Sequence, residues 1–449
     1  MANLRSQCAR TVLRRRAALP KRPIMPVFLV PCRILLPAIL LLFALTITPA
    51  PAMEPAIVVP AADHQQGNAQ SVAFSADGRL VAAGFGGSYS TRGKERFQSG
   101  RIVIWEAATG KVVKSVAEHG DIVGLQFAAD GKSCLYSRIY TPGDSVDANY
   151  SKLIPVGDGD DDATSLSFGR NSYIATLSPS GAAMAIAKTV DIAQVYDDAA
   201  MVHAAADVHK LSIVDSYTAK ALAFSPDGET FAAVHGRQEP IIRKDGTVVL
   251  KARVIRTKGL TLFDTGNWSV QDSAISDELA DCSALAVSPT ARWLATGHPN
   301  GVVRIWDGRS LQKAHELKLE TNKSLLPRFS PDGKTLAVLS QPPNALVWRR
   351  ANTPSGFEFE RRPNQSPCEL VQYETETFTP LRTFQFEDGS FRTYHANLPA
   401  ASQNPARLAF SPDSRQILVG CNGVILLDAE TGETVRQFDA PLAAAQKSK

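Results

Sequence analysis

The sequence predicts an all-β fold in which one unit of antiparallel strands is repeated, and three observations support this prediction. A short apolar strand, a turn related to Ser-Pro-Asp-Gly and a second apolar strand recur seven times. These strands alternate apolar residues with small or polar ones, as half-buried strands do. The closest turns, centred on positions 290 and 332, have the spacing of about 40–45 residues that is typical of a four-stranded unit. Together they predict a seven-bladed β-propeller of four-stranded antiparallel blades.

The seven turns share a chemistry that reverses the chain. Proline fixes φ at the second turn position, and Asp-Gly supplies a side-chain acceptor and a residue that tolerates positive φ. The copies are Val72–Gly78, Leu125–Gly131, Ala175–Gly181, Leu222–Gly228, Leu285–Ala291, Pro327–Gly333 and Leu408–Ser414.

The second half of the unit is clearest in the fifth copy. There Leu294–Gly297 reads as a strand, Pro299–Gly301 as a tight turn, Val302–Asp307 as the third strand and Gln312–Leu317 as the fourth. In the first copy, the third strand is Gly100–Glu106. Weaker third strands are expected to end at Tyr196-Asp197, Phe263-Asp264, Trp348 and Leu427-Asp428.

The Phe-Ser-Pro-Asp-Gly turn, the Ile-Trp-Asp strand end and the Thr-Gly-Lys turn resemble those of WD (WD40) repeats over about residues 56–440. The resemblance implies a propeller that serves as a binding platform rather than an enzyme. A TolB-like propeller shares the Pro-Asp-Gly turn and stays the alternative, although the tryptophans favour the WD type. The residues of the repeat signature are Asp77, Gly78, Trp105, Asp130, Gly131, Asp227, Gly228, Trp306, Asp307, Asp332 and Gly333.

The sequence also departs from the WD pattern. The usual Gly-His pair is reversed at His119-Gly120 and replaced by Asp281–Ser283 in the fifth copy, and Asn300 stands where the tight turn usually has Asp. The residues therefore do not predict the polar network of a typical blade, although they still predict the fold.

Residues 1–52 have the composition of a secretory leader. They hold eight basic residues and no acidic one, followed by the uncharged run Ile34–Ile47 and by Ala50 and Ala52 at signal-cleavage spacing. We expect a cleaved signal peptide and export to the periplasm or the extracellular space. An uncleaved membrane anchor through residues 34–47 is the main alternative, although 14 residues are fewer than the roughly 20 of a spanning helix; a buried core helix is the third. Translation could start at Met1 or Met25.

Charge and cysteines exclude some functions for the rest of the chain. Outside residues 1–52, 40 basic residues face 44 acidic ones, which removes the electrostatic argument for nucleic-acid binding. Four scattered cysteines form no Cys-x-x-Cys pair, so no metal site is predicted. If the chain is exported, one or two disulfides are permitted, in any of three pairings. The apolar surroundings of two of the four cysteines favour free buried thiols instead. These two are Cys134 and Cys421, and the other two are Cys282 and Cys368.

Four segments exceed a minimal blade and are where function is expected. Gly84–Gly100 and His235–Gly259 both lie between the second and third strands of their units, so both would emerge on the same face of the propeller. Asp158–Asp162 could suggest calcium, but an EF-hand loop would need glycine at position 163 and glutamate at 169, so a solvated acidic turn is favoured. The aromatic-rich segment Arg349–His395 is expected to add an outer strand and a packed cap, with a partner-docking surface as the alternative.

The second of these segments is rich in basic residues, which favours a solvated hairpin, with a binding surface for an anionic partner as the alternative interpretation. The candidate residues are Arg237, Arg243, Lys244 and Arg253.

Catalytic motifs do not emerge. Neither Gly-x-Ser-x-Gly nor His-Glu-x-x-His occurs, and Gly333–Thr335 imitates a phosphate loop whose leading glycine position holds Arg328. We therefore expect an exported, noncatalytic, monomeric scaffold that binds a protein or peptide through one loop face, without a cofactor. A small-ligand-binding, hydrolytic or lyase-type propeller with its site at the central channel is the alternative. Residues 441–449 are expected to form a disordered tail.

Overall fold

The computed structural model divides the chain into two units, residues 1–52 and 53–449, and all residues that it describes lie in the second. The predicted leader, its run at residues 34–47 and the predicted tail therefore lie outside the described residues. Within the described part of the chain, no helix is long and apolar enough to cross a bilayer. The described residues are 56–59, 69–86, 100–118, 121–139, 150–157, 166–167, 175–181, 183–186, 193–196, 208–211, 218–242, 248–280, 282, 284–299, 301–319, 325–340, 346–350, 357–361, 368–387, 407–421 and 423–439.

Six of the sheets consist of four consecutive antiparallel strands, as predicted, and we number the sheets in chain order. Sheet 1 contains β2 (Ala69–Phe74), β3 (Leu80–Phe85), β4 (Gly100–Glu106) and β5 (Val112–Glu118); sheet 2 contains β6 (Asp121–Phe127), β7 (Ser133–Ile139), β8 (Tyr150–Pro155) and β9 (Leu166–Ser167); sheet 3 contains β10 (Ala175–Leu177), β11 (Met184–Ile186), β12 (Ala193–Tyr196) and β13 (Val208–Leu211). Sheet 4 contains β14 (Thr218–Phe224), β15 (Thr230–Ile242), β16 (Val248–Asp264) and β17 (Val270–Ile275); sheet 5 contains β18 (Ala284–Val287), β19 (Trp293–Gly297), β20 (Val302–Asp307) and β21 (Lys313–Lys318); sheet 7 contains β28 (Leu408–Phe410), β29 (Gln416–Gly420), β30 (Val424–Asp428) and β31 (Thr434–Phe438).

Sheet 6 differs from the prediction because it has five strands, so four-stranded blades occur six times in the described residues and not seven. Its strands are β22 (Leu325–Phe329), β23 (Thr335–Ser340), β26 (Cys368–Glu374), β27 (Pro380–Phe386) and β1 (Ile57–Val59). The added strand β1 pairs in parallel with β27, with Ile57 opposite Phe384.

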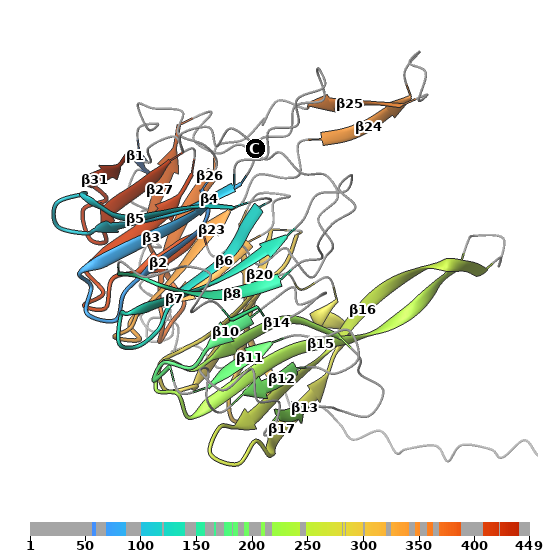
Figure 1. Cartoon of the computed structure of the whole chain (residues 1–449). Coiled ribbons are helices and arrows are strands. Elements are labelled where there is room, and N and C mark those ends of the chain that lie inside the picture. The colour runs from blue at the N-terminus through green and yellow to red at the C-terminus, as the bar shows by residue number, and fades with distance from the viewer. Residues whose placement is uncertain are drawn as a thin grey trace, which may run out of the picture. The chain divides into compact units, whose positions relative to one another are not determined.

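The third strand of sheet 6 is β26, and the prediction that it ends at Trp348 was wrong. Trp348 lies in β24 (Leu346–Arg350), which pairs with β25 (Phe357–Arg361) in a separate two-stranded hairpin (Figure 1). The apolar run Leu346–Trp348 followed by two arginines suits the end of a blade strand and an inserted hairpin alike, so the local pattern could not choose between them. Residues 349–395 supply β26 and β27, the third and fourth strands of sheet 6, and the further strand outside β27 is β1.

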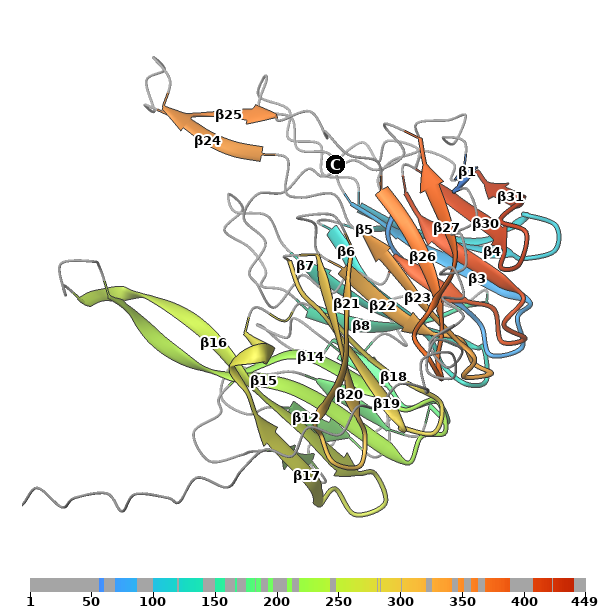
Figure 2. The ribbon, with the colours of Figure 1, turned by 180° about the vertical axis from the view of Figure 1, so that it is seen from behind.

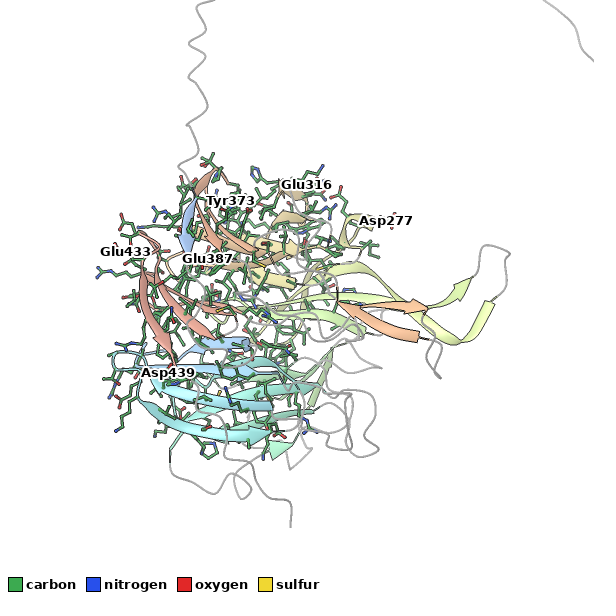
Figure 3. The ribbon with its side chains drawn as sticks, turned by 90° about the horizontal axis from the view of Figure 1, so that it is seen from above. Asp277, Glu316, Tyr373, Glu387, Glu433 and Asp439 are labelled. Carbon is green, nitrogen blue, oxygen red and sulfur yellow. The ribbon has the colours of Figure 1, made fainter. Side chains whose placement is uncertain are left out.

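The first strands of the sheets contact one another in the order β2, β6, β10, β14, β18, β22, β28, and β28 contacts β2 again. The strands therefore form a closed ring. At the seam between sheets 1 and 7, Trp105 Nε1 donates to the carbonyl oxygen of Asp439 over 2.9 Å, and its ring packs on Phe438 with centroids 5.4 Å apart. Figure 3 shows Asp439 where these two sheets meet.

The sequence left open which end of the chain closes the ring, and the structure assigns this role to β31. Sheet 7 consists entirely of C-terminal strands, whereas β1 lies on sheet 6 and β2 begins sheet 1. The N-terminal segment therefore has an anchor on each side of sheet 7. Its ends are held by backbone bonds, from Glu387 N to Val59 O (3.1 Å) and from Ala69 N to Cys421 O (2.8 Å).

The four cysteines are buried thiols within the apolar core. Burial raises the pKa of Cys134 to about 12, and it raises that of Cys282 to the same value. Both side chains therefore stay protonated and poorly nucleophilic near neutral pH.

Candidate functional site

The seven predicted turns all connect the first and second strands of a sheet, and their polar residues hold the turns in shape. In the first copy, Ser75 Oγ donates to Asp77 Oδ1 (2.6 Å) and accepts from Leu80 N (2.9 Å). Asp77 Oδ1 also accepts from Arg79 N, and the Ser75 hydrogen bond is the main reason why the pKa of Asp77 is lowered. The same arrangement recurs at Ser225, Ser330 and Ser411.

Neighbouring turns also pack on one another, and we call the seven turns together the turn collar. A Cβ added to Gly78 would lie 3.4 Å from Pro412 Cδ, and one added to Gly333 would lie 3.4 Å from Pro289 Cγ. Between sheets 6 and 7, Asp332 N donates to Ser414 Oγ over 3.0 Å. The Asp and Gly residues of the turns in the repeat signature are therefore structural.

Sheet 5 contains a polar network that the sequence did not predict. Trp306 Nε1 donates to Thr296 Oγ1 (2.9 Å), which leaves the Thr296 hydroxyl hydrogen for His298 Nε2 at 3.1 Å. His298 Nδ1 then donates to the carbonyl oxygen of Ala280 over 3.1 Å. His298, which precedes the tight turn, thus bonds Ala280, which precedes the segment where the usual Gly-His pair is missing, and Trp306 is a member of this network.

The β15–β16 hairpin is the longest departure from a minimal blade. Only its base is held in sheet 4, since β14 pairs with β15 no further than Gly236 and β17 pairs with β16 from Gly259 onward. Beyond this base the two strands pair with no other described strand than each other, and they project past the sheet (Figures 1 and 2). This confirms the hairpin expected for residues 235–259.

The structure brings part of the predicted partner-binding set together on this hairpin. Arg237 of β15 pairs with Arg256 of β16, and Pro240 pairs with Arg253. Arg243 and Lys244 lie outside the described residues, between the two strands. Arg256 was not singled out with this set, although its charge and strand position were visible in the sequence.

The insertions share one connection, between the second and third strands of a sheet. The β15–β16 hairpin uses it in sheet 4, and β24–β25 uses it in sheet 6. Since consecutive strands are antiparallel, this connection lies at the end of a sheet opposite the turn collar. Gly84–Gly100 falls on the same connection of sheet 1, but its residues 87–99 lie outside the described part of the chain, as does Asp158–Asp162.

A cavity of about 490 Å³ lies between the first strands of the sheets. Six of these strands or their turns contribute to its walls, so it lies in the centre of the ring. Apolar side chains dominate the lining, and Arg328 of β22 is the only ionisable side chain among the lining residues that the structure describes. In the sequence, Arg328 stood out only because it occupies the leading glycine position of a phosphate loop. A channel-lining role was not inferred from it.

No described group of three or more His, Cys, Asp or Glu side chains could hold a metal ion.

Sheet 5 contains the segment that matches a known protein family. Residues 276–307 match the family model "WD domain, G-beta repeat", and they span the short 3-10 helix Asp277–Leu279 and strands β18 to β20. This stretch is a WD repeat. The WD repeat includes Trp306 and Asp307, on which the predicted resemblance depended most, and it favours the WD type over the TolB-like alternative.

The fold as a whole is similar to solved β-propellers. One of them is the β-propeller domain of Myceliophteria thermophila Cps50 (Swd1), with a TM-score of 0.51 at 15% sequence identity. The similarity covers 82% of this chain and 95% of that domain. No curated protein matches the sequence. At this identity, the likeness to the Cps50 domain concerns the fold alone.

Proposed function

We propose that this WD-repeat propeller is a noncatalytic scaffold, and that its β15–β16 hairpin docks an acidic segment of a protein partner. The concentration of positive charge on the hairpin carries the proposal. Residues 235–259 contain seven basic residues and two acidic ones. Outside this segment and residues 1–52, acidic residues outnumber basic ones by 42 to 33. Charge complementarity of this kind steers a partner to one place on a surface.

The strand pairing supports the same role. Arg237 and Arg256 occupy directly paired positions, and like charges opposite each other on neighbouring strands destabilise a hairpin. An acidic partner would relieve this repulsion. The projecting part of each strand also has an edge that pairs with no other described strand, and such an edge can accept an added strand.

Charge reversal on the hairpin tests the proposal. We expect the triple variant Arg237→Glu, Arg253→Glu, Arg256→Glu to bind a fluorescent Glu-rich peptide at least about tenfold more weakly than the native protein, since close charge pairs couple by about 1.5 kcal/mol or more. Fluorescence anisotropy at low and physiological salt measures this. The matched control reverses three exposed turn arginines, Arg79 and Arg415 of the turn collar and Arg309 between β20 and β21, and should bind nearly as the native protein does. Equal losses in both triple variants would show that net charge alone is responsible and would reject the hairpin site.

We propose further that the protein is exported and is either released or tethered through residues 34–47. The charge asymmetry of residues 1–52 and the small residues Ala50 and Ala52 support this. Affinity capture from membrane and soluble fractions, followed by mass spectrometry, would report the partner, the compartment and the mature N-terminus together. A mature N-terminus at Met1 or Met25, found only in the cytoplasmic fraction, would contradict it.

A further inference from the structure

We propose that the central cavity binds a carboxylate carried by an apolar group, with Arg328 as the counter-ion. This site is distinct from the hairpin and adds a small ligand, or the end of a peptide chain, to what the propeller can bind.

The position of Arg328 places a cation in a mostly apolar space. The cavity walls include Val72, Phe74, Leu222 and Phe410, from three different sheets. Arg328 keeps part of its surface exposed there. Burial by the surrounding protein lowers its pKa to about 10, so that the guanidinium remains charged at neutral pH.

The donors of Arg328 are largely unused within the described structure. Its Nη1 donates to the carbonyl oxygen of Pro327, its own neighbour, over 2.9 Å. No carboxylate occurs among the described residues that line the cavity. A guanidinium has five N–H donors in a planar fork, which leaves donors for a bound oxyanion.

The other polar side chains of the cavity are already engaged. Gln126 Oε1 accepts from Leu177 N (2.9 Å) and from Thr176 Oγ1 (3.2 Å), while Gln126 Nε2 donates to Leu177 O (2.9 Å). The hydroxyls of Ser137 and Ser151 bond to each other at 2.8 Å. Arg328 is therefore the group that sets the charge preference of the cavity.

The charge count selects the class of anion. A buried cation without a partner is costly, and a hydrogen-bonded partner of opposite charge offsets that cost. A carboxylate carries one negative charge and matches the arginine fork with two parallel hydrogen bonds. A phosphate dianion would bring a second charge that nothing in the described lining neutralises. The apolar walls complement an aliphatic or aromatic body on the ligand.

Calorimetric titration of the full-length protein tests the site with defined probes. We expect 3-phenylpropionate to bind at least about tenfold more tightly than its neutral isostere 3-phenylpropanamide, since a charge-assisted hydrogen bond contributes this much. Inorganic phosphate should bind more weakly than the carboxylate. A peptide ending in free Phe, compared with its amidated form, distinguishes a chain terminus from a free organic acid as the source of the carboxylate.

Two variants locate the binding. Arg328→Met should abolish the preference for the acid over the amide, whereas Arg328→Lys should retain part of it. The control Arg309→Met removes an exposed arginine from the turn between β20 and β21 and should leave the preference intact. None of the three should change binding of the acidic peptide to the hairpin, so the two proposals can fail separately.

Several results would overturn the proposal. They are equal affinity of the native protein for the acid and the amide, tighter binding of phosphate than of the carboxylate, and an unchanged acid preference in Arg328→Met. Because the first comparison uses only the native protein, it remains decisive even where Arg328→Met does not fold.

Discussion

At the scale of single residues, His235 shows how close packing fixes both a neighbour and a protonation state. The side chain is 2% exposed, and its Nε2 lies 2.9 Å from Thr261 Oγ1. Its ring covers Gly259, where an added Cβ would lie 2.0 Å from the ring Cε1. Only glycine leaves room for the imidazole there. Burial lowers the pKa of His235 to about 4.

This histidine should make the stability of the protein depend on pH. Its pKa is about 4 when folded and about 6.5 when unfolded, so the unfolded chain binds the proton more readily between these values. The stabilisation is complete above about pH 6.5 and is lost as the pH falls toward 4, by about 3 kcal/mol in all. The free energy of unfolding in urea, measured from pH 7.5 to 4.5, checks this against His235→Gln. An equal pH slope in both proteins would rule out His235 as the cause.

Arg328 shows what single residues reveal in sequence and what they do not. The middle residues of the seven apolar triplets before the turns are Ala73, Gln126, Thr176, Ala223, Ala286, Arg328 and Ala409, and Arg328 is the only charged one. This signal was present once the repeats were aligned. The position of Arg328 in a cavity could not be predicted from this signal, because only the closed ring brings six first strands around that cavity.

At the scale of elements, the turns were the part of the fold that sequence predicted best, since Pro, Asp and Gly act within a few residues. Five turns place glycine at positive φ, but the fifth and seventh place Ala291 (φ 54°) and Ser414 (φ 64°) there. The third strand of sheet 6 was missed because its pairing with β23 is decided across an insertion of 27 residues, 341–367, and not by local chemistry.

The two exceptional turns should respond differently to glycine. We expect Ala291→Gly to raise the free energy of unfolding by about 1 kcal/mol, because it relieves a left-handed conformation that disfavours a side chain. Ser414→Gly should gain less, since Ser414 Oγ accepts from Asp332 N across the turn collar. Urea unfolding of both variants measures the difference. A larger gain for Ser414→Gly would mean that this hydrogen bond contributes nothing.

At the scale of the whole ring, closure depends on the contacts between sheets 1 and 7. Leu418, Val424 and Phe438 of sheet 7 share one apolar cluster with Val81 and Trp105 of sheet 1. The guanidinium of Arg436 adds bonds to the carbonyl oxygens of Thr109 and Ala108 at 3.1 and 2.8 Å. The sequence showed both terminal strands but could not rank them, since both are short segments that contain β-branched residues.

Removal of β31 should therefore open the ring. A chain that ends at Glu433 loses Phe438 and the acceptor of Trp105 Nε1, and we expect it to unfold at least about 3 kcal/mol more easily, the scale of deleting one large aromatic side chain from a core. Thermal melting and limited proteolysis report this. A chain that ends at residue 441 keeps every described seam contact and should melt as the full chain does. Equal stability of the two truncations would assign closure to another segment.

The late arrival of β31 has a consequence for biosynthesis. Because sheet 7 is built only from the last strands, the flank of Trp105 and Val103 stays uncovered from the moment β5 emerges from the ribosome until the chain is nearly finished. At about 5–20 residues per second, that interval is on the order of half a minute. During this interval the nascent chain exposes an apolar surface to which a chaperone can bind. The chaperone would be released when β31 pairs with β30 and covers that surface.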